Sequence, residues 1–524
     1  MYCAVKTSIL YGINSIDVSC EADVSSGMPY FSMVGFLSSD IKESKDRIKT
    51  AIKNSNVQFP AKKITVNISP ASIKKSGSSF DLPIAIAILG AMGEIPTDNL
   101  KDIMFIGEMN LSGDILPVRG VLSCVLNCLK NKISYIFVPE ENKNEASIIS
   151  DVKVIPVNSL KSVINILRNR EIDDKLIFNK NNKNNLSNGI EGNNSIESEK
   201  NDLSEENEAD FSYLRGNPTL KKAIEIAVSG MHNILLIGPP GTGKSYAASL
   251  VPSILPKVTL KEKIEISKIY SAAGLFNDNS PLIDKRPFRS PHHSISQFGM
   301  LGGGTHPTPG EITLATNGVL FLDEILEFKR SILESLRQPL EEHIISISKS
   351  GYSVTFPADF MLIASSNPCP CGYYPNLSKC NCSKNDIERY LSKLSGPILD
   401  RIDLTCSVSP IKISSLSDSD EMSSYNMKRN ILDAIEIQKK RFYGTSIKYN
   451  SKIPSSKINT YCSLKEDVNE YLIKRTKNMD LSIRAYHKIL KLSRTIADLN
   501  KENEISIKDI DTALRFRDRI SIFH

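Results

Sequence analysis

The sequence predicts a mixed α/β protein of several domains, with an α+β region first, an α/β core in the middle and a helical region last. Three observations lead to this prediction. The chain has 524 residues, which is too long for a single hydrophobic core. Strand-like and helical apolar patterns alternate along much of it. A polar, acidic segment near residue 190 separates two apolar regions.

The first region, residues 1–165, contains both kinds of pattern. Residues 63–68 alternate apolar and polar side chains with the period of a strand. Residues 82–92 are apolar and rich in alanine, which suits a buried helix, and residues 135–139 have the pattern of a buried strand that ends at a proline. We therefore expect an α+β domain here.

Residues 166–210 differ in composition from both neighbours. Residues 181–194 are rich in Asn, Gly and Ser, and residues 191–210 hold eight acidic side chains against one lysine. Such a segment buries too little apolar surface to order itself. We expect a flexible, solvated acidic linker.

A glycine-rich motif lies in the core, predicted over residues 211–410. It follows a predicted strand at 233–237, precedes a predicted helix, and matches G-x-x-x-x-G-K-[ST] at every position. Its residues are Gly238, Pro239, Pro240, Gly241, Thr242, Gly243, Lys244 and Ser245. Backbone N–H groups of such a loop, and the helix dipole behind it, favour phosphate. The motif predicts an ATP site in which Lys244 reaches the β- and γ-phosphates and the Ser245 hydroxyl ligates Mg²⁺.

Two further predicted strands end in the polar residues that such a site requires. The strand at 318–322 leads to Asp323 and Glu324. We expect Asp323 near Mg²⁺ and Glu324 polarising the attacking water. The strand at 360–366 leads to Asn367, whose amide we expect to orient the same water. An asparagine before a proline also suits a turn, and the two roles are compatible.

Three arginines are candidates for charge stabilisation. Arg401, within 399–404, is predicted to be an arginine finger that reaches the γ-phosphate bound by a neighbouring subunit. A surface ion pair with a nearby acid is the alternative interpretation. Arg389 is a second finger candidate. Arg484, just inside a helix that Ser482 opens, is our candidate for the second nucleotide sensor.

Several further motifs carry a family resemblance. They lie at residues 286–294 (RPFRSPHHS), 301–304, 309–311, 319–324, 396–404 and 484–487. This set resembles the Mg-chelatase-like AAA+ ATPases of the ComM/YifB type, over almost the whole chain except the acidic linker. The resemblance implies an AAA+ core and a helical lid domain of the Mg-chelatase C-terminal type over residues 411–524. It also implies a ring, expected to be a hexamer, that acts as a DNA motor in branch migration or unwinding during recombination or natural transformation.

Other functions stay open at this point. A magnesium-chelatase-like motor that remodels a protein or metal-insertion partner is the main alternative, although chelatase ATPase subunits lack the N-terminal region seen here. An ATP-dependent protease and a DNA-binding scaffold that uses ATP only for assembly are the others.

The resemblance also draws attention to a hairpin before Asn367. Residues 344–348 and 352–356 alternate around Lys349, Ser350 and Gly351, and the glycine suits a tight turn. In related rings a lysine at this tip touches DNA phosphate, so Lys349 is our DNA-binding candidate, without sequence preference. A solvent-exposed lysine on an ordinary hairpin is the alternative.

Residues 105–108, 116–120 and 138–140 resemble the Lon protease, which implies a Lon-like fold with the Ser–Lys dyad of that family. Ser79 aligns with the serine, but Leu122 stands where the lysine should be. Leucine transfers no proton. We therefore expect an inactive domain that serves DNA contact or assembly.

Four cysteines form a C-x-C-x₈-C-x-C pattern: Cys369, Cys371, Cys380 and Cys382. Four thiolates this close can close a tetrahedral Zn²⁺ site. The usual spacing is C-x₂₋₄-C, so free thiols in a Gly/Pro-rich loop are the alternative.

The bulk properties fit these expectations. The net charge of +6 and the pI near 8.6 permit a nucleic-acid partner without requiring one. The first residues show no basic segment followed by an apolar run, and no stretch reaches the roughly 18 apolar residues of a membrane span. With few cysteines outside the cluster, we expect a cytoplasmic, reduced protein without membrane contact.

Overall fold

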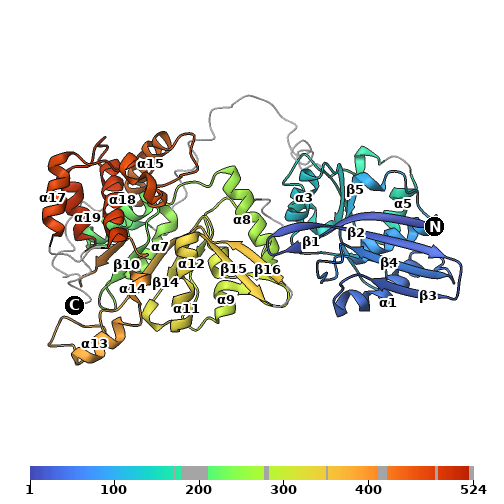
Figure 1. The fold of residues 1–524 in the computed structure, drawn as a ribbon, viewed down its shortest axis with the longest axis horizontal. Coiled ribbons are helices and arrows are strands. Elements are labelled where there is room, and N and C mark those ends of the chain that lie inside the picture. The colour runs from blue at the N-terminus through green and yellow to red at the C-terminus, as the bar shows by residue number, and fades with distance from the viewer. Residues whose placement is uncertain are drawn as a thin grey trace.

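The computed structural model describes residues 1–169, 172–178, 210–276, 282–349, 352–410, 422–477 and 482–517. Two α/β bodies lie next to each other along the long axis, and helices of the carboxyl end lie at the far end of the second body (Figure 1). The predicted mixed α/β class is confirmed. Most of the predicted acidic linker, residues 179–209, lies outside the described residues.

The first body is a seven-stranded sheet with helices packed on it. The strand order is β3-β4-β2-β1-β5-β8-β9. β1 and β2 are antiparallel, whereas β1, β5, β8 and β9 run parallel. The strands are β1 (Tyr2–Tyr11), β2 (Asn14–Ser25), β3 (Tyr30–Val34), β4 (Lys63–Ser69), β5 (Ile103–Phe105), β8 (Tyr135–Pro139) and β9 (Lys153–Val157), and a small pair is formed by β6 (Glu108–Met109) and β7 (Ile115–Leu116). The helices are α1 (Ser39–Asn54), α2 (Asp81–Met92), α3 (Val121–Lys130), α4 (Lys143–Ala146) and α5 (Leu160–Arg168).

The sequence patterns of this body have a clear structural origin. α2 is buried at every position from Asp81 to Ala91, which explains its uninterrupted apolar sequence. β4 alternates buried and half-buried residues because one of its faces packs on the core. Both elements, and β8, were predicted.

The second body is built on a five-stranded parallel sheet with the order β11-β14-β17-β10-β18. Its strands are β10 (Ile234–Ile237), β11 (Phe288–Arg289), β14 (Val319–Leu322), β17 (Met361–Ser366) and β18 (Leu404–Ser407). β10, β14 and β17 are buried at every position, as expected for a parallel sheet covered on both faces. All three were predicted from their apolar runs.

Helices and two hairpins surround this sheet. The helices are α6 (Pro218–Gly230), α7 (Lys244–Ile254), α8 (Leu260–Ala273), α9 (Gln297–Leu301), α10 (Glu311–Leu314), α11 (Arg330–Ser335), α12 (Arg337–Glu342), α13 (Lys384–Leu391) and α14 (Gly396–Leu399). The hairpins pair β12 (Gly302–Gly303) with β13 (Thr308–Pro309), and β15 (Ile344–Lys349) with β16 (Tyr352–Pro357). The predicted hairpin at Lys349 is therefore present, and its tip residues Ser350 and Gly351 lie outside the described residues.

The described residues from 422 to 517 form helices and short turns without a strand. The helices are α15 (Ser424–Arg441), α16 (Ile458–Tyr461), α17 (Glu466–Thr476), α18 (Ile483–Leu499) and α19 (Ile507–Arg515). Ser482 caps α18 through its hydroxyl, where the sequence predicted a helix start, and Ser506 caps α19 in the same way. In the described part of the chain, we find no helix with both the length and the apolar character that a bilayer crossing needs.

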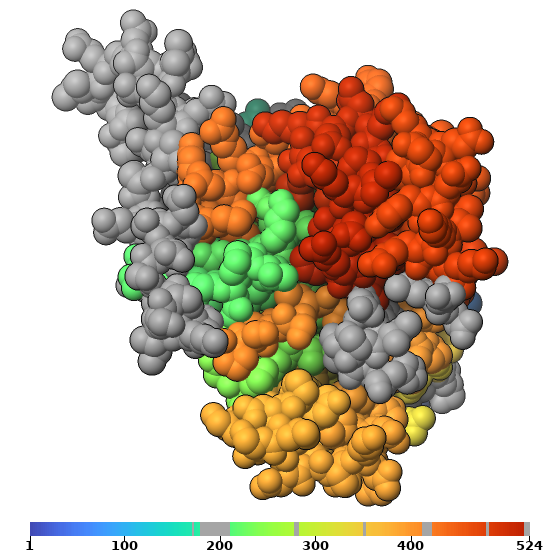
Figure 2. Space-filling model, turned by 90° about the vertical axis from the view of Figure 1, so that its left-hand side faces the viewer, coloured from blue at the N-terminus to red at the C-terminus, as the bar shows by residue number. Residues whose placement is uncertain are grey.

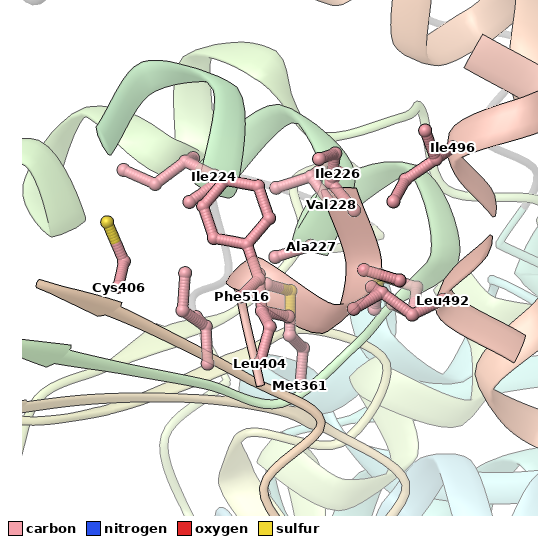
Figure 3. Close-up of a cluster of buried hydrophobic side chains, with 14 of the residues drawn as sticks. Ile224, Ile226, Ala227, Val228, Met361, Leu404, Cys406, Leu492, Ile496 and Phe516 are labelled. Atoms are coloured by element: carbon pink, nitrogen blue, oxygen red, sulfur yellow. The ribbon is translucent and has the colours of Figure 1, made fainter. Parts of the chain in front are cut away.

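One hydrophobic core joins these helices to the sheet. Side chains of α6, α18 and β18 point toward one another around Phe516 (Figure 3). Leu492 of α18 is fully buried there, together with Ile224 and Leu404. The position of α18 relative to the sheet is thus fixed by apolar packing.

The tip of the β1–β2 hairpin docks on the β15–β16 hairpin of the second body. The Tyr11 hydroxyl donates to the Ser353 carbonyl at 3.1 Å, and Ile13 is buried in the core of the second body. Gly12 has a φ of 66°, and a Cβ there would lie 2.5 Å from Val354. Glycine is therefore required both by the backbone and by the close approach.

The packing of α18 predicts the cost of a core deletion. We expect Leu492→Ala to lower the free energy of unfolding by about 2–5 kcal/mol, because a buried leucine leaves a cavity. Leu432→Ala on α15 is the control, since Leu432 is 40% exposed. Chemical denaturation measures both, and an equal effect of the two changes would contradict the described packing.

Candidate active site

The parallel sheet brings three polar segments together at its carboxyl edge, by which we mean the edge where the strands end. The register pairs Ile237 of β10 with Ser366 of β17, and Leu322 of β14 with Ala364 of β17. The residues that follow these strands therefore lie side by side. They are the glycine-rich loop at 238–245, the acidic pair, and Asn367.

The glycine-rich loop connects β10 directly to α7, as predicted. Gly241 and Gly243 have φ values of 76° and 85°, which side-chain-bearing residues rarely adopt. A Cβ on Gly238 would lie 2.3 Å from the Val408 carbonyl oxygen. The loop thus depends on its glycines, and α7 opens at Lys244 with its N-terminus toward the loop. This arrangement suits an anion at the helix N-terminus.

The Lys244 ammonium folds back over the loop. It donates to the carbonyls of Gly238 at 2.6 Å and Pro239 at 2.9 Å, and lies 3.4 Å from the Asn367 side-chain oxygen. Burial lowers the pKa of Lys244, whereas Asp323 and Glu324 oppose that shift. Phosphate oxygens would offer this ammonium stronger, charged partners than carbonyls.

The acidic pair is held by a serine that the sequence did not point out. The Ser365 hydroxyl of β17 donates to the Asp323 carboxylate and accepts from the Glu324 backbone amide at 3.0 Å. Glu324 has a φ of 49° and its side chain is exposed. A left-handed backbone at a glutamate is uncommon and occurs preferentially at functional sites. Asp323 is half-buried beside it.

The donor set at this edge fits a nucleotide with Mg²⁺. Mg²⁺ prefers oxygen ligands, and the exposed Ser245 hydroxyl and the Asp323 carboxylate supply them. Thr242 closes the loop by donating to the Pro239 carbonyl at 2.8 Å. The structure therefore brings together Lys244, Asp323, Glu324 and Asn367, as the sequence predicted.

Two of the predicted arginines, Arg401 and Arg484, lie elsewhere, at the amino edge of the same sheet, where the strands begin. Asn233 lies just before β10, and its side-chain amide donates to the Arg401 carbonyl at 3.1 Å. β18 begins three residues after Arg401. The four residues of β10 span about 13 Å between the two edges. Arg401 is thus separated from the phosphate loop of its own chain by the length of the sheet.

Glu341, at the end of α12, is the shared ion-pair partner of two of the arginines. It forms an ion pair with Arg401 and another with Arg484, the latter at 2.9 Å. Arg401 also donates to the carbonyls of Arg337 at 3.1 Å and Pro397 at 2.6 Å. The ion pair considered as an alternative for Arg401 is therefore present. Arg389 is exposed on α13 and lies outside this group.

The two arginines line a cavity of about 320 Å³ together with further cations. Lys452, Lys488 and Lys491 line it as well, and burial lowers the pKa of Lys491. Although burial opposes it, Lys488 and His232 hold the pKa of Asp403 well below its usual range. Lys488 and Asp403, 2.7 Å apart, tie α18 to the amino edge. Glu341, Asp400 and Asp403 line the same cavity, so its cations outnumber its carboxylates but are partly paired with them.

Three family descriptions match the chain. "Magnesium chelatase, subunit ChlI" matches residues 210–416, "Subunit ChlI of Mg-chelatase" matches residues 20–142, and the ChlI C-terminal description matches residues 421–517. The competence protein ComM of Haemophilus influenzae is 39% identical over 97% of this chain and 95% of its own length. The uncharacterized protein YifB of Salmonella typhimurium is 37% identical over 99% of this chain and 98% of its own length.

The chain belongs to the Mg-chelatase-like AAA+ ATPases of the ComM/YifB type. The predicted family is thus confirmed. A Lon protease of Geobacter metallireducens is also 28% identical over 163 residues, which are 30% of this chain and 19% of that protease. In this ComM/YifB-type protein Leu122 is fully buried on α3, and its backbone amide donates to Glu145 at 2.8 Å. Because leucine at position 122 cannot transfer a proton, we still predict that this domain has no protease activity.

The arrangement at the carboxyl edge predicts that different substitutions affect ATP binding and ATP hydrolysis. We expect Glu324→Gln to keep ATP binding and to lower the hydrolysis rate by about 10²-fold or more, because an amide cannot polarise water as a carboxylate does. Lys244→Ala should instead weaken ATP binding. Nucleotide affinity and phosphate release measure the two effects.

Glu466→Gln is the matched control, since Glu466 is exposed on α17. Normal turnover in Glu324→Gln would contradict the role given to this residue.

Proposed function

We propose that this protein is an ATP-driven DNA motor, assembled as a ring that is expected to be a hexamer, and that it promotes branch migration or unwinding during homologous recombination or natural transformation. The observation that carries the proposal is the separation of Arg401 from the phosphate loop of its own chain. An arginine at the amino edge can serve only a nucleotide bound by another subunit. The relative ComM of Haemophilus influenzae is named as a competence protein, which supports the biological setting.

The ATPase chemistry follows from the carboxyl edge. The backbone amides at 238–245 and the Lys244 ammonium bind the phosphates, and the Asn367 amide orients the attacking water. Glu324 is exposed and polarises that water. Bound Mg²⁺, held by Ser245 and Asp323, supplies neutralisation of phosphate charge.

The cavity at the amino edge supplies the other half of the site. Arg401 and Arg484 sit on opposite oxygens of one carboxylate, so they are held together as a pair. A γ-phosphate presented by the neighbouring subunit carries more charge than the single carboxylate of Glu341. It would therefore compete for both guanidinium groups.

The β15–β16 hairpin is the proposed DNA contact. Lys349 is the last residue of β15 and pairs with Tyr352 across the tip. A ring of such lysines would bind backbone phosphate without reading sequence, and this binding should weaken steeply with salt. The N-terminal body contacts this hairpin through Tyr11, whose hydroxyl bonds to Ser353 next to the tip pair, and Ile13 packs in the core beneath the hairpin.

Branched DNA with ATP provides the direct test. Synthetic three- and four-way junctions are incubated with the protein, and strand exchange is followed with ATP, without ATP, and with Glu324→Gln. We expect exchange only with ATP and the wild-type chain. ATPase stimulation by a protein partner, with none by any DNA, would instead favour the magnesium-chelatase-like remodelling motor.

The hairpin gives a separate prediction. We expect Lys349→Ala to leave the basal ATPase rate intact and to abolish its stimulation by DNA, because the phosphate contact is lost. Lys261→Ala, at an exposed lysine of α8, is the control. Unchanged junction unwinding by Lys349→Ala would remove the lysine from the DNA contact.

A further inference from the structure

The four cysteines of the C-x-C-x₈-C-x-C pattern lie in one cluster after β17. Their sulfur atoms all lie within 4.8 Å of one another. Cys369 lies 3.3 Å from Cys371 and 3.7 Å from Cys380, and Cys371 lies 3.5 Å from Cys380. With Zn–S bonds of about 2.3 Å, a zinc tetrahedron has S–S edges of about 3.8 Å. A disulfide needs about 2.05 Å, so these separations fit a shared metal far better.

The loop that carries the cysteines is folded for this arrangement. The Gly372 amide donates to the Cys369 carbonyl at 3.0 Å, and the Cys380 amide donates to the Asn376 carbonyl at 2.8 Å. The Tyr374 amide points at the Cys369 sulfur, at 3.4 Å. A backbone N–H directed at sulfur stabilises the thiolate form, which is the form that binds metal. The turn explains how two C-x-C pairs face a common centre despite their short spacing.

This cysteine loop, residues 369–382, contacts the proposed ATPase site. Asn367 lies two residues before Cys369. Gly372 has a φ of 84°, and a Cβ there would lie 2.7 Å from the Pro240 side chain of the phosphate loop and 3.9 Å from the Asn367 side-chain carbon. Gly372 is therefore packed tightly against the phosphate loop and lies beside the proposed water-orienting residue.

The other end of the cysteine loop is anchored to the acidic strand end. α13 begins two residues after Cys382, behind the capping residue Ser383. Past α13, the Lys393 ammonium donates to the Leu326 carbonyl at 3.0 Å, in the turn that follows Glu324. The residues around α13 form a lobe, yellow-orange in Figure 2, that projects at one end of this face. Along the chain, the cysteines lie between Asn367 and α13.

We propose that Cys369, Cys371, Cys380 and Cys382 bind one Zn²⁺ ion, and that this ion positions Asn367 against the phosphate loop. Without the ion, no disulfide or salt bridge among residues 369–382 ties the two cysteine pairs together. With the Zn²⁺ ion bound, the cysteine loop is held rigidly between β17 and α13. Binding releases the thiol protons and involves no redox change. The positioning part of this proposal rests on the proposed ATPase site.

Metal content tests the site itself. The full chain is purified without chelators, and zinc is measured by mass spectrometry. We expect about one zinc per chain, and loss of it in the double variant Cys380→Ser, Cys382→Ser. Asn381→Ala, an exposed residue between the same two cysteines, is the matched control and should keep zinc. Less than about half an equivalent of zinc in the wild-type chain would overturn the site.

Hydrogen exchange and kinetics test the positioning role. Zinc is stripped from the wild-type chain with a chelator and then restored, so that the result does not depend on how a variant folds. We expect faster amide exchange at residues 367–376 and 238–245 without zinc. We also expect kcat to fall about tenfold or more, because small misplacements of a catalytic group are costly. The ATP dissociation constant should change less, and zinc should reverse all effects.

Exchange that does not change on zinc removal would overturn the positioning role even if zinc is bound. Zinc content and amide hydrogen exchange are measured without ATP hydrolysis. They therefore test the zinc site and its positioning role even if the wild-type chain proves inactive as an ATPase. Failure of the proposed function would then be seen separately, as absent turnover with zinc in place.

Discussion

The direction of the five parallel strands decides where each functional side chain lies. Parallel strands put all their carboxyl ends at one edge, and the phosphate loop, the acidic pair and Asn367 follow three of those ends. Arg401 precedes a strand, so it lies at the opposite edge. No side chain is long enough to cross the sheet, which is buried on both faces. This separation is why we propose that each chain contributes one half of a site that a second copy completes.

Glu341 makes the amino-edge half stable before a partner arrives. Two guanidinium groups close together repel each other, and a carboxylate between them offsets that repulsion. Arg401 is 15% exposed and Arg484 is 64% exposed, so the first is fixed while the second is accessible. The two interpretations of Arg401, an ion pair and an arginine finger, are thus compatible. In the proposed ring, Glu341 would hold Arg401 in place until the neighbouring nucleotide competes for it.

Local motifs could be predicted from the sequence, and contacts between distant segments could not. The glycine-rich loop, its strand and its helix occupy eight consecutive residues and their flanks, so their chemistry was visible, and likewise the strand ends at Asp323 and Asn367. Ser365 carries no signal of its own, because its importance comes from lying beside another strand end. Glu341 lies 60 residues from Arg401 and 143 from Arg484, and only the fold brings them together.

Mixing two inactive variants tests the central claim most directly. Lys244→Ala has no working nucleotide site but still offers Arg401, and Arg401→Ala has the opposite defect. Each alone should lose most of the ATPase rate, since an arginine finger is worth about 10³–10⁵ in rate. The account predicts that the mixture recovers activity well above the sum of the two, through sites joined between unlike subunits. A mixture no more active than its parts, or an Arg401→Ala chain with the wild-type rate, would contradict it.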